Sequence, residues 1–270
     1  MYSRKRVTSL LGIVAMVFLY CAPQLVAQTS SDQPTVSTAA ARKSSSKKDP
    51  QGAGKVGVGF RVSTLGLGGE AAYQVTHSSN VRGGFNVFNY SRSFNNSGIN
   101  YNGDLRWLSV EAHYDWFPFS HFAHTFHLSP GLIAYNDNHV NASASSAGGN
   151  TFTLNHVTYQ SNPANPVGGT GTLAFNKAAP TFMFGFGNLV PRNRKHFSAH
   201  IEAGVAFQGS PKIGLDLTGS ACVPGTATCS NVATDPIVQS NVHAEQTILS
   251  NDLSPFKYYP IVALTLGYRF

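Results

Sequence analysis

The stretch Tyr258–Phe270 constrains the fold more than any other feature of the sequence. Every second residue in it is apolar or aromatic, and the residues in between become small and polar towards its end. This period-two alternation predicts a long strand with one apolar face and one mixed face. Because a lipid bilayer offers backbone groups no partner, strands cross it only as closed barrels with apolar outer faces. The stretch therefore predicts one strand of a transmembrane β-barrel.

Seven further segments alternate in the same way, and Asp104–Trp116 is the clearest of them. There Val110 and Tyr114 lie on one face, whereas Glu111 and Asp115 lie on the other. The pattern predicts an all-β chain folded as an eight-stranded antiparallel up-and-down transmembrane β-barrel. The eight predicted strands are Val56–Ser63, Leu67–Thr76, Val81–Tyr90, Asp104–Trp116, Phe126–Asn136, Thr172–Gly187, Phe197–Gln208 and Tyr258–Phe270.

The connections between these strands alternate in length. Bacterial barrels place short turns in the periplasm and long loops outside the cell, so the alternation predicts the orientation of the chain. The predicted short turns are residues 77–80, 117–125 and 188–196, and the predicted long polar loops are residues 91–103, 137–171 and 209–257.

The first 55 residues differ from the rest of the chain. Arg4, Lys5 and Arg6 precede a short apolar run, which predicts a signal peptide over residues 1–27 with cleavage after Ala27; Ala22 is the alternative site. Residues 28–55 are rich in Ser, Thr, Ala, Gln and Lys and have few apolar residues to bury, which predicts a disordered leader. The barrel domain is then residues 56–270.

Charge is distributed unevenly along the chain. Residues 1–55 hold eight Lys/Arg and two Asp, whereas residues 56–270 hold eleven Lys/Arg and ten Asp/Glu. The net charge of +7 therefore belongs almost entirely to the leading segment and does not indicate a nucleic-acid partner. Charged residues make up only 11% of the chain, well below the ~25% of a soluble domain.

Two cysteines remain once the predicted signal peptide is removed. Cys222 and Cys229 lie close together in a segment rich in Gly, Thr and Ser. In an oxidising compartment this spacing predicts a disulfide that closes a small loop. The cysteines and the ten histidines show no spacing typical of a metal site, and we expect neither a metal nor a cofactor.

Seven segments also carry a family resemblance. The chain resembles a widespread group of small outer-membrane β-barrel proteins of the opacity-protein and OmpA/OmpW-like type. The resemblance implies an eight-stranded barrel, residence in the bacterial outer membrane and an assembly signal at Tyr268 and Phe270, but no activity. It rests on residues 64–75 (TLGLGGEAAYQV), 82–90 (RGGFNVFNY), 101–119 (YNGDLRWLSVEAHYDWFPF), 126–138 (FHLSPGLIAYNDN), 180–188 (PTFMFGFGN), 204–212 (GVAFQGSPK) and 256–270 (FKYYPIVALTLGYRF).

The alternation directs ten titratable side chains into the barrel. Eight strands enclose a space barely wide enough for side chains, and a buried unpaired charge costs several kcal/mol. We therefore predict a network of ion pairs and hydrogen bonds that fills the lumen; a gated polar path for small solutes is the alternative. The predicted members are Arg61, Glu70, Arg82, Glu111, His113, Asp115, His127, His200, Glu202 and Arg269.

One pair of residues suggests catalysis. His127 and Ser129 lie, together with Tyr135, on the inner face of the predicted strand Phe126–Asn136, and carboxylates lie on other strands. This arrangement resembles the catalytic groups of outer-membrane lipid A deacylases, in which His activates Ser for attack on an ester. The residues around His127 depart from that family and match the general barrel group. A lipid-modifying hydrolase is therefore the second alternative for function.

The sequence thus predicts a monomeric integral outer-membrane barrel with a structural or surface-interaction role and no enzymatic activity. Its expected partners are outer-membrane lipids, lipopolysaccharide, the barrel-assembly machinery and an extracellular ligand of unknown identity. The first alternative is a narrow passage for small or hydrophobic compounds, as OmpW-like barrels suggest.

Overall fold

A computed structural model describes residues 55–96, 99–119, 125–192, 195–226 and 228–270. The chain divides into two units, Met1–Gln51 and Gly52–Phe270, and the description below concerns the second. The predicted signal peptide and nearly all of the predicted leader lie outside the described residues. No helix in the described ranges is long and apolar enough to span a membrane.

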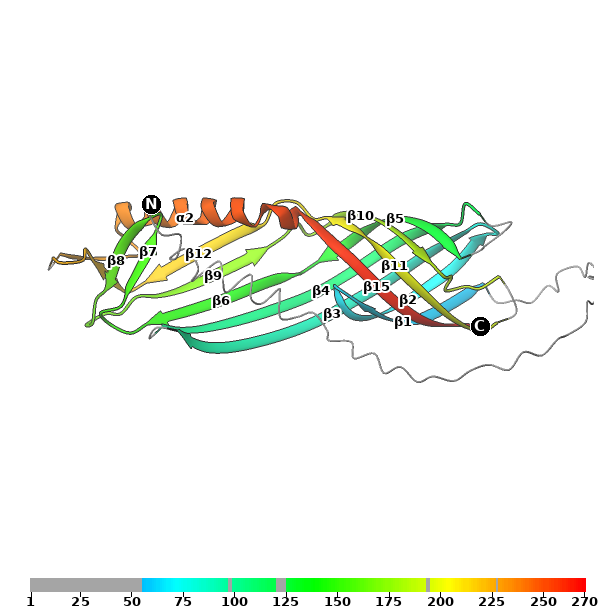
Figure 1. Cartoon of the computed structure of the whole chain (residues 1–270), viewed down its shortest axis with the longest axis horizontal. Coiled ribbons are helices and arrows are strands. Elements are labelled where there is room, and N and C mark those ends of the chain that lie inside the picture. The colour runs from blue at the N-terminus through cyan, green and yellow to red at the C-terminus, as the bar shows by residue number, and fades with distance from the viewer. Residues whose placement is uncertain (1–54, 97–98, 120–124, 193–194, 227) are drawn as a thin grey trace, which may run out of the picture. The chain divides into compact units, whose positions relative to one another are not determined.

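Eight antiparallel strands close into a barrel, as the alternation predicts. Each strand pairs with its sequence neighbour in the barrel, and the last strand pairs back onto the first, where Val58 lies opposite Tyr268. Figure 1 shows this closure at the end of the chain marked C. The barrel strands are β1 (Val56–Ser63), β2 (Gly66–Thr76), β3 (Ser79–Asn96), β4 (Ile99–Trp116), β5 (Phe126–Asn136), β10 (Ala179–Phe186), β11 (Phe197–Phe207) and β15 (Tyr258–Arg269).

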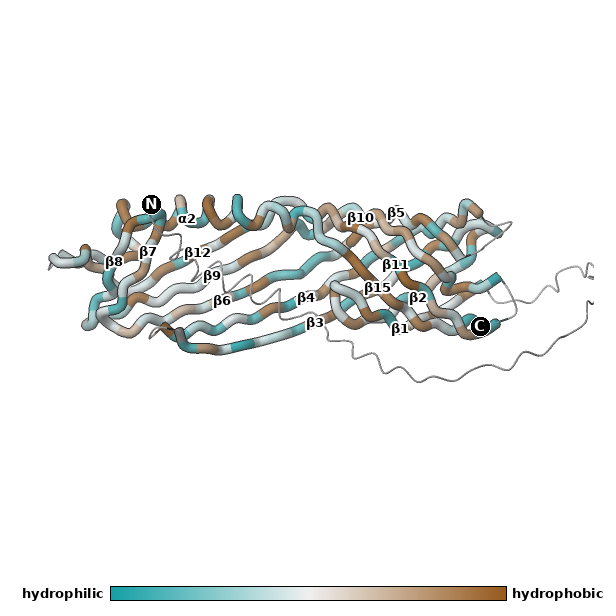
Figure 2. The backbone as a smooth tube through the Cα atoms, viewed as in Figure 1, coloured by the Kyte–Doolittle hydropathy of each residue, from teal (hydrophilic) through white to brown (hydrophobic). Residues whose placement is uncertain are grey.

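The barrel wall has an apolar outside and a mainly polar inside. Along β10, for example, Phe182, Phe184 and Phe186 are exposed, whereas Thr181 before them and Met183 between them are buried. The same alternation of hydrophobic and hydrophilic residues runs along the neighbouring barrel strands (Figure 2). This arrangement is the one that a closed sheet adopts when lipid surrounds it.

One predicted facing is wrong, because strand β5 contains a bulge. Alternation places Tyr135 on the inner face, but its side chain is 45% exposed on the outer face. The pairing of β5 with β4 skips Ala134, since Glu111 lies opposite Ile133 and Val110 lies opposite Tyr135. An extra residue in one strand reverses the facing of every residue beyond it.

The sixth predicted strand, Thr172–Gly187, is also wrong in its extent. Two separate strands occupy this range, β9 (Gly168–Ala174) and the barrel strand β10. Between them the chain is tied to the end of β5, where the backbone N–H of Asn136 donates to the Lys177 carbonyl at 2.8 Å and the Asn136 amide donates to the Asn176 carbonyl at 2.9 Å.

The predicted long polar loops are folded, and this corrects the largest part of the prediction. Strands β3 and β4 continue past the barrel, and β4 pairs there with β6 instead of β5, which starts a sheet in the order β3–β4–β6–β9–β12. We name residues 88–107, 137–178 and 208–257 the distal module. Its other elements are β6 (His139–Ser146), β7 (Thr151–Leu154), β8 (Val157–Ser161), β9, β12 (Lys212–Thr218), β13 (Ser220–Cys222), β14 (Cys229–Asn231), α2 (Pro236–Asp252) and η1 (Ser254–Lys257).

Helix α2 gives the distal module a hydrophobic core of its own. It begins after Asp235, whose carboxylate accepts hydrogen bonds from two backbone N–H groups of the first turn, and it lies beside β12 (Figure 1). The side chain of Gln246 donates to the Leu215 carbonyl of β12 at 3.2 Å. The buried residues of this core are Leu154, Tyr159, Val167, Ala221, Val232, Val238 and Val242.

The facing of apolar residues reverses where β4 passes from the barrel into the distal module. On the outer face of β4, the residues from Leu108 to Trp116 are apolar, but Asn102, Asp104 and Arg106 are polar and exposed. On the inner face the polar residues of the barrel give way to aromatic and aliphatic ones, and Leu105 is buried. The period-two alternation therefore continues along the whole of β4, but the apolar residues lie on the outer face in the barrel and on the inner face in the distal module.

Candidate functional site

The barrel lumen is the first candidate site, because all ten side chains predicted to fill it are buried. None is more than 5% exposed. They come from seven strands, so the pairing register of the wall sets their positions. Eight of the ten meet in one cluster, and two lie apart from it.

Two arginines form the centre of the cluster. Arg82 contacts Glu70 at 3.0 Å, Asp115 at 3.1 Å and Glu202 through both of its terminal nitrogens. Arg61 reaches Glu70 at 2.9 Å and two further carboxylates, those of Glu111 at 3.2 Å and Glu202 at 3.4 Å. Each arginine thus bridges several strands, and the shared carboxylates link the two arginines.

Two histidines complete the cluster by contacting its carboxylates. The Nε2 atom of His127 lies 3.1 Å from Glu202, and the Nε2 atom of His200 lies 2.9 Å from Glu70. The cluster holds two arginines and four carboxylates. The two imidazoles contact Glu70 and Glu202, which are the carboxylates that both arginines contact. Charges this deeply buried persist only when they are paired and hydrogen-bonded.

Two of the ten predicted residues lie apart from the cluster. His113 meets the hydroxyl of Thr181 at 3.1 Å, and Arg269 donates to the Pro191 carbonyl at the barrel end where the short turns lie. Conversely, Asn86 joins the cluster by donating to Glu111 at 3.2 Å. Its inward position in the alternation could have identified it, but an uncharged side chain gave no further signal.

The arrangement of His127 and Ser129 does not support a hydrolase. The Ser129 hydroxyl donates to Asp115 at 2.7 Å, and the histidine contacts Glu202 instead of the serine. A nucleophile must give its proton to a general base within hydrogen-bond reach. Both side chains are also at most 2% exposed, so an ester substrate has no access to them.

One group of residues in the lumen has the composition of a metal site. Ligand atoms of Glu70, His200 and Glu202 lie within 4.8 Å of one another. Arg82, however, already contacts both of these carboxylates. A cation would have to compete with a guanidinium for the same oxygens, so the geometry fits an ion-pair cluster better than a metal centre.

An apolar layer seals the lumen on the side of the distal module. Leu65 lies in the tight link between β1 and β2 and is 1% exposed, and Met183 is 0% exposed. Tyr259 packs against this layer. The ring of Tyr259 also meets Trp107 of the distal module, with ring centres 5.9 Å apart. The buried residues of the layer are Leu65, Ile133, Ala179, Met183, Ala206 and Ile261.

A second apolar layer closes the lumen at the opposite end of the barrel, where the short turns lie. Leu189 and Val190 are buried against Ala72 of the barrel wall. A Cβ atom at Gly57 would lie only 2.4 Å from the Leu189 carbonyl oxygen, so glycine is required there for the turn to enter the barrel. Asn80 holds this turn by a 3.0 Å hydrogen bond to Asn188.

The surface of the distal module is the second candidate site. The predicted disulfide between Cys222 and Cys229 is formed, and it joins β13 to β14. Hydrogen bonds from the Ser230 hydroxyl and from the Val238 backbone N–H lower the pKa of the Asp235 carboxyl at the start of α2. The disulfide and this helix cap therefore tie β13 to β14 and the start of α2 to the preceding residue at the surface of the module.

Comparison with known proteins adds evidence on the fold. No family model matches the chain, and no curated protein matches it. Solved structures of CarO and CarO2 from Acinetobacter baumannii are similar to it. CarO has a TM-score of 0.52 and 21% identity over 82% of this chain and 100% of that chain, and CarO2 has 0.51 and 20% over 80% and 98%. At this identity the likeness shows the fold, and the predicted opacity-protein and OmpA/OmpW-like membership stays a prediction.

Proposed function

We propose that the chain is an integral bacterial outer-membrane barrel that displays the distal module at the cell surface, in a structural or surface-interaction role without catalysis. One observation carries this proposal. The lumen is packed with paired charges and closed by an apolar layer at each end, whereas the distal module is a folded unit with its own core. The accessible part of the protein is therefore the module.

The outer face of the barrel supports membrane residence. Large apolar side chains on every side of the wall are about half exposed, among them Phe60, Phe85, Phe184 and Leu264. Soluble monomers rarely expose contiguous apolar patches beyond a few hundred Å². Lipid removes this cost because the wall then faces hydrocarbon, and aromatic residues such as Trp116 mark its edge.

The lengths of the connections support an orientation. The turns between β2 and β3 and between β10 and β11 lie at one end, and the distal module lies at the other. Bacterial barrels face the periplasm with short turns. We infer that the distal module is extracellular, where lipopolysaccharide and a ligand can meet it, and that the envelope's barrel-assembly machinery inserts the chain.

The passage for small or hydrophobic compounds is the weaker function. A solute would have to displace the layer around Met183, separate the contacts of Arg82 and then expel Leu189 from the other mouth. Three consecutive barriers of packed side chains fit a closed barrel better than an open one.

Three measurements test the proposal. A refolded closed barrel should migrate faster on a gel before boiling than after it, and the protein should fractionate with outer membranes. In planar bilayers the protein should give no discrete conductance steps, whereas an open porin measured in the same bilayers should give them. Discrete steps would favour the passage, and a soluble protein without heat-modifiable migration would overturn membrane residence.

A further inference from the structure

One edge of the distal sheet has no neighbouring strand. The order of this sheet is β3–β4–β6–β9–β12, so its two edges are β3 and β12. Strand β2 pairs with β3 only as far as Val87, and no strand in the described ranges pairs with the far side of residues 88–96. In Figure 1 this length of β3 and helix α2 lie on opposite borders of the distal module. We name residues 88–96 the open edge.

The other edge, β12, is covered by side chains of α2. The Gln246 amide donates to the Leu215 carbonyl of β12 at 3.2 Å. The Ser250 hydroxyl donates at 3.2 Å to the carbonyl of Pro211, the residue before β12. Proteins usually protect a sheet edge by such a cover or by Pro and Lys residues, because an unpaired strand is a template for pairing. The open edge has neither Pro nor Lys, and its single charged residue is Arg92.

The pairing pattern identifies the backbone groups that point away from the sheet at the open edge. The N–H of Phe117 donates to the Ser78 carbonyl at 2.9 Å, so residue 78 and every second residue after it turn their N–H and C=O towards β4. The residues in between turn theirs to the other side, where they pair with β2 as far as Val87. Within the open edge these outward-turned residues are Asn89, Ser91, Ser93 and Asn95.

Aromatic side chains lie along the open edge on the inner face of the sheet. Phe94 stacks on Tyr101 of β4 with ring centres 5.2 Å apart, and Phe88 lies 5.6 Å from Trp107 in the same way. Tyr90, between the two pairs, is 39% exposed. The rings are therefore held by β4 and present an apolar surface next to the unpaired backbone.

One positive charge interrupts this aromatic surface. Arg92 is exposed and lies opposite Gly103, which has no side chain to cover it. By the pairing register, Arg92 is the only charged residue on the inner face of the described distal sheet. The carboxylate of the adjoining strand, Asp104, lies on the outer face and accepts a hydrogen bond from the Ser91 hydroxyl. An acidic group of a partner therefore fits beside Arg92.

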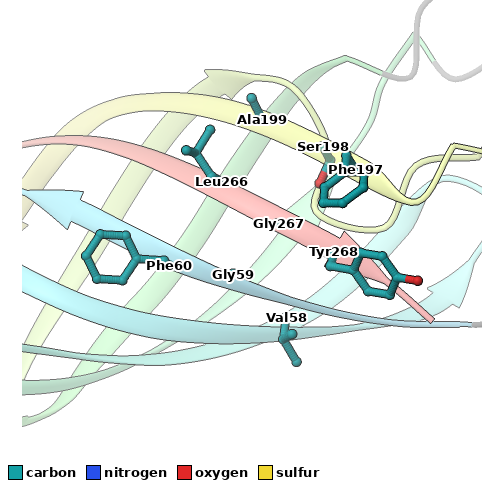
Figure 3. Close-up of a pocket in the computed structure, with 9 residues that line it drawn as sticks. All are labelled: Val58, Gly59, Phe60, Phe197, Ser198, Ala199, Leu266, Gly267 and Tyr268. Atoms are coloured by element: carbon teal, nitrogen blue, oxygen red, sulfur yellow. The ribbon is translucent and has the colours of Figure 1, made fainter.

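The barrel wall offers a partner no comparable backbone. A hollow in the wall lies across β1, β15 and β11, where Phe60, Leu266 and Tyr268 border it (Figure 3). Each of these three strands is paired on both sides, and the hollow faces lipid under the proposed function. A further strand therefore cannot be added there.

We propose that the open edge binds an extended segment of another polypeptide, which adds a strand to the distal sheet and places an acidic residue beside Arg92 between apolar residues. The inference rests on the proposed function, which makes the distal module the accessible part of the protein. In this mode of recognition main-chain hydrogen bonds supply affinity, and alternate side chains supply specificity. Here Ser91 and Ser93 supply the main-chain groups, and Tyr90 and Phe94 meet the apolar side chains.

Hydrogen exchange, measured by NMR on the refolded full chain in micelles, tests the open edge. The probe is the synthetic peptide Val-Thr-Val-Thr-Glu-Thr-Val-Thr-Val with blocked ends, whose Val and Glu side chains share one face when it is extended. Without the peptide, the amides of Ser91 and Ser93 should exchange fast, whereas those of Arg92 and Phe94 should be protected by β4. At a peptide concentration of about ten times the dissociation constant, the two serine amides should exchange about tenfold more slowly.

Matched variants separate the backbone contribution from the charge contribution. Ser93→Pro removes one outward N–H without removing a hydrogen bond to β4, so peptide binding should weaken by about tenfold or more. Ser93→Ala keeps that N–H and should bind the peptide as the original chain does. Arg92→Gln should weaken binding by about two- to fivefold, whereas Arg106→Gln, on the outer face, should not change it.

Three results would overturn the proposal. Slow exchange of Ser91 and Ser93 without peptide would mean that a second copy or another segment already covers the edge. Failure of the peptide to slow these amides, or equal binding by Ser93→Pro and Ser93→Ala, would exclude strand addition, and unchanged binding by Arg92→Gln would exclude an acidic partner. Heat-modifiable migration is recorded for each variant, so a failure of the membrane barrel is distinguished from a failure of the open edge.

Discussion

The barrel wall and the distal module share strands but expose opposite faces. In the barrel half of β4, Val110 and Tyr114 point outward and Glu111 points inward; in the distal half, Asp104 points outward and Leu105 points inward. The backbone is a regular strand in both halves. With the barrel wall in lipid, as proposed above, and the distal module in water, the solvent around each part of a strand decides which of its faces is apolar.

The same difference appears in how each region is held together. The barrel fills its interior with arginines and carboxylates, which must be paired because water is excluded. The distal module fills its interior with aliphatic side chains beneath α2, as a water-soluble domain does. Each region should therefore respond to a different kind of substitution.

The largest expected effect is on the charge cluster. Replacing Arg82 with Met leaves Glu70, Asp115 and Glu202 short of their shared partner and should cost about 3–5 kcal/mol of barrel stability. Replacing Arg106, which is exposed on the outer face of the distal module, with Met should change stability by less than about 0.5 kcal/mol. Urea unfolding in lipid vesicles measures both, and equal costs would contradict the distinction between the regions.

The stability cost of an arginine added to the outer face should differ between the two regions along the single strand β4. Val110→Arg should cost about 2–4 kcal/mol, because the charge enters the hydrocarbon layer. Asn102→Arg, on the same face of β4 but in the distal module, should cost almost nothing, because the side chain stays in water. Unfolding midpoints in vesicles compare the two variants, and similar losses would mean that lipid does not surround the wall.

Removal of the disulfide should affect the distal module alone. In the chain-entropy model the short ring between Cys222 and Cys229 contributes about 2–3 kcal/mol of local order at most. The Cys222→Ser, Cys229→Ser variant should therefore show faster proteolysis between β13 and β14 and unchanged heat-modifiable migration. A variant that fails to form the barrel would show that the two regions fold as one.

The smallest expected effect is a pH dependence at the start of α2. The pKa of Asp235 is lowered in the folded chain, so its contribution to stability is present above the unfolded pKa of about 3.9. That contribution is lost as the pH falls through the folded pKa. The protection factors of the amides in the first turn of α2, which compare their exchange with that of an unstructured peptide at the same pH, should therefore fall below about pH 4.

Asp235→Asn is the matched control for this effect. Asparagine also caps helices but does not titrate, so the protection factors of this variant should stay nearly constant over the same pH range. If the protection factors of the variant and of the original chain fall equally, the carboxylate does not stabilise the helix.

The barrel could be predicted from the sequence because each of its strands repeats the same period-two alternation of apolar and polar residues. Phe126–Asn136 and Val56–Ser63 have the predicted bounds, and all ten inward titratable residues are buried. The pairs within the lumen could not be predicted, because they depend on the register between strands. Tyr135 was misplaced because a bulge leaves no mark in a period-two pattern.

The distal module was missed for a different reason. Its strands contain many Gly, Ala, Ser and Asn residues, which resemble loops in composition, and its core residues come from segments far apart in the chain. One signal was nevertheless present. In residues 99–107 the alternation continues with Tyr101, Leu105 and Trp107 on the face that carries Glu111 further along, so the phase had reversed without a break in the strand.

Site-directed spin labelling along β4 most directly tests whether the outer face of this strand changes from lipid-facing in the barrel to water-facing in the distal module. Single labels at residues 102, 104, 106, 108, 110, 112 and 114 all point outward, and the protein is reconstituted in phospholipid bilayers. Labels at 108–114 should be accessible to oxygen dissolved in lipid, and labels at 102–106 should be accessible to a water-soluble nickel complex, with a switch between Arg106 and Leu108. Uniform accessibility to the nickel complex along the whole strand would contradict the membrane barrel and the division into two regions.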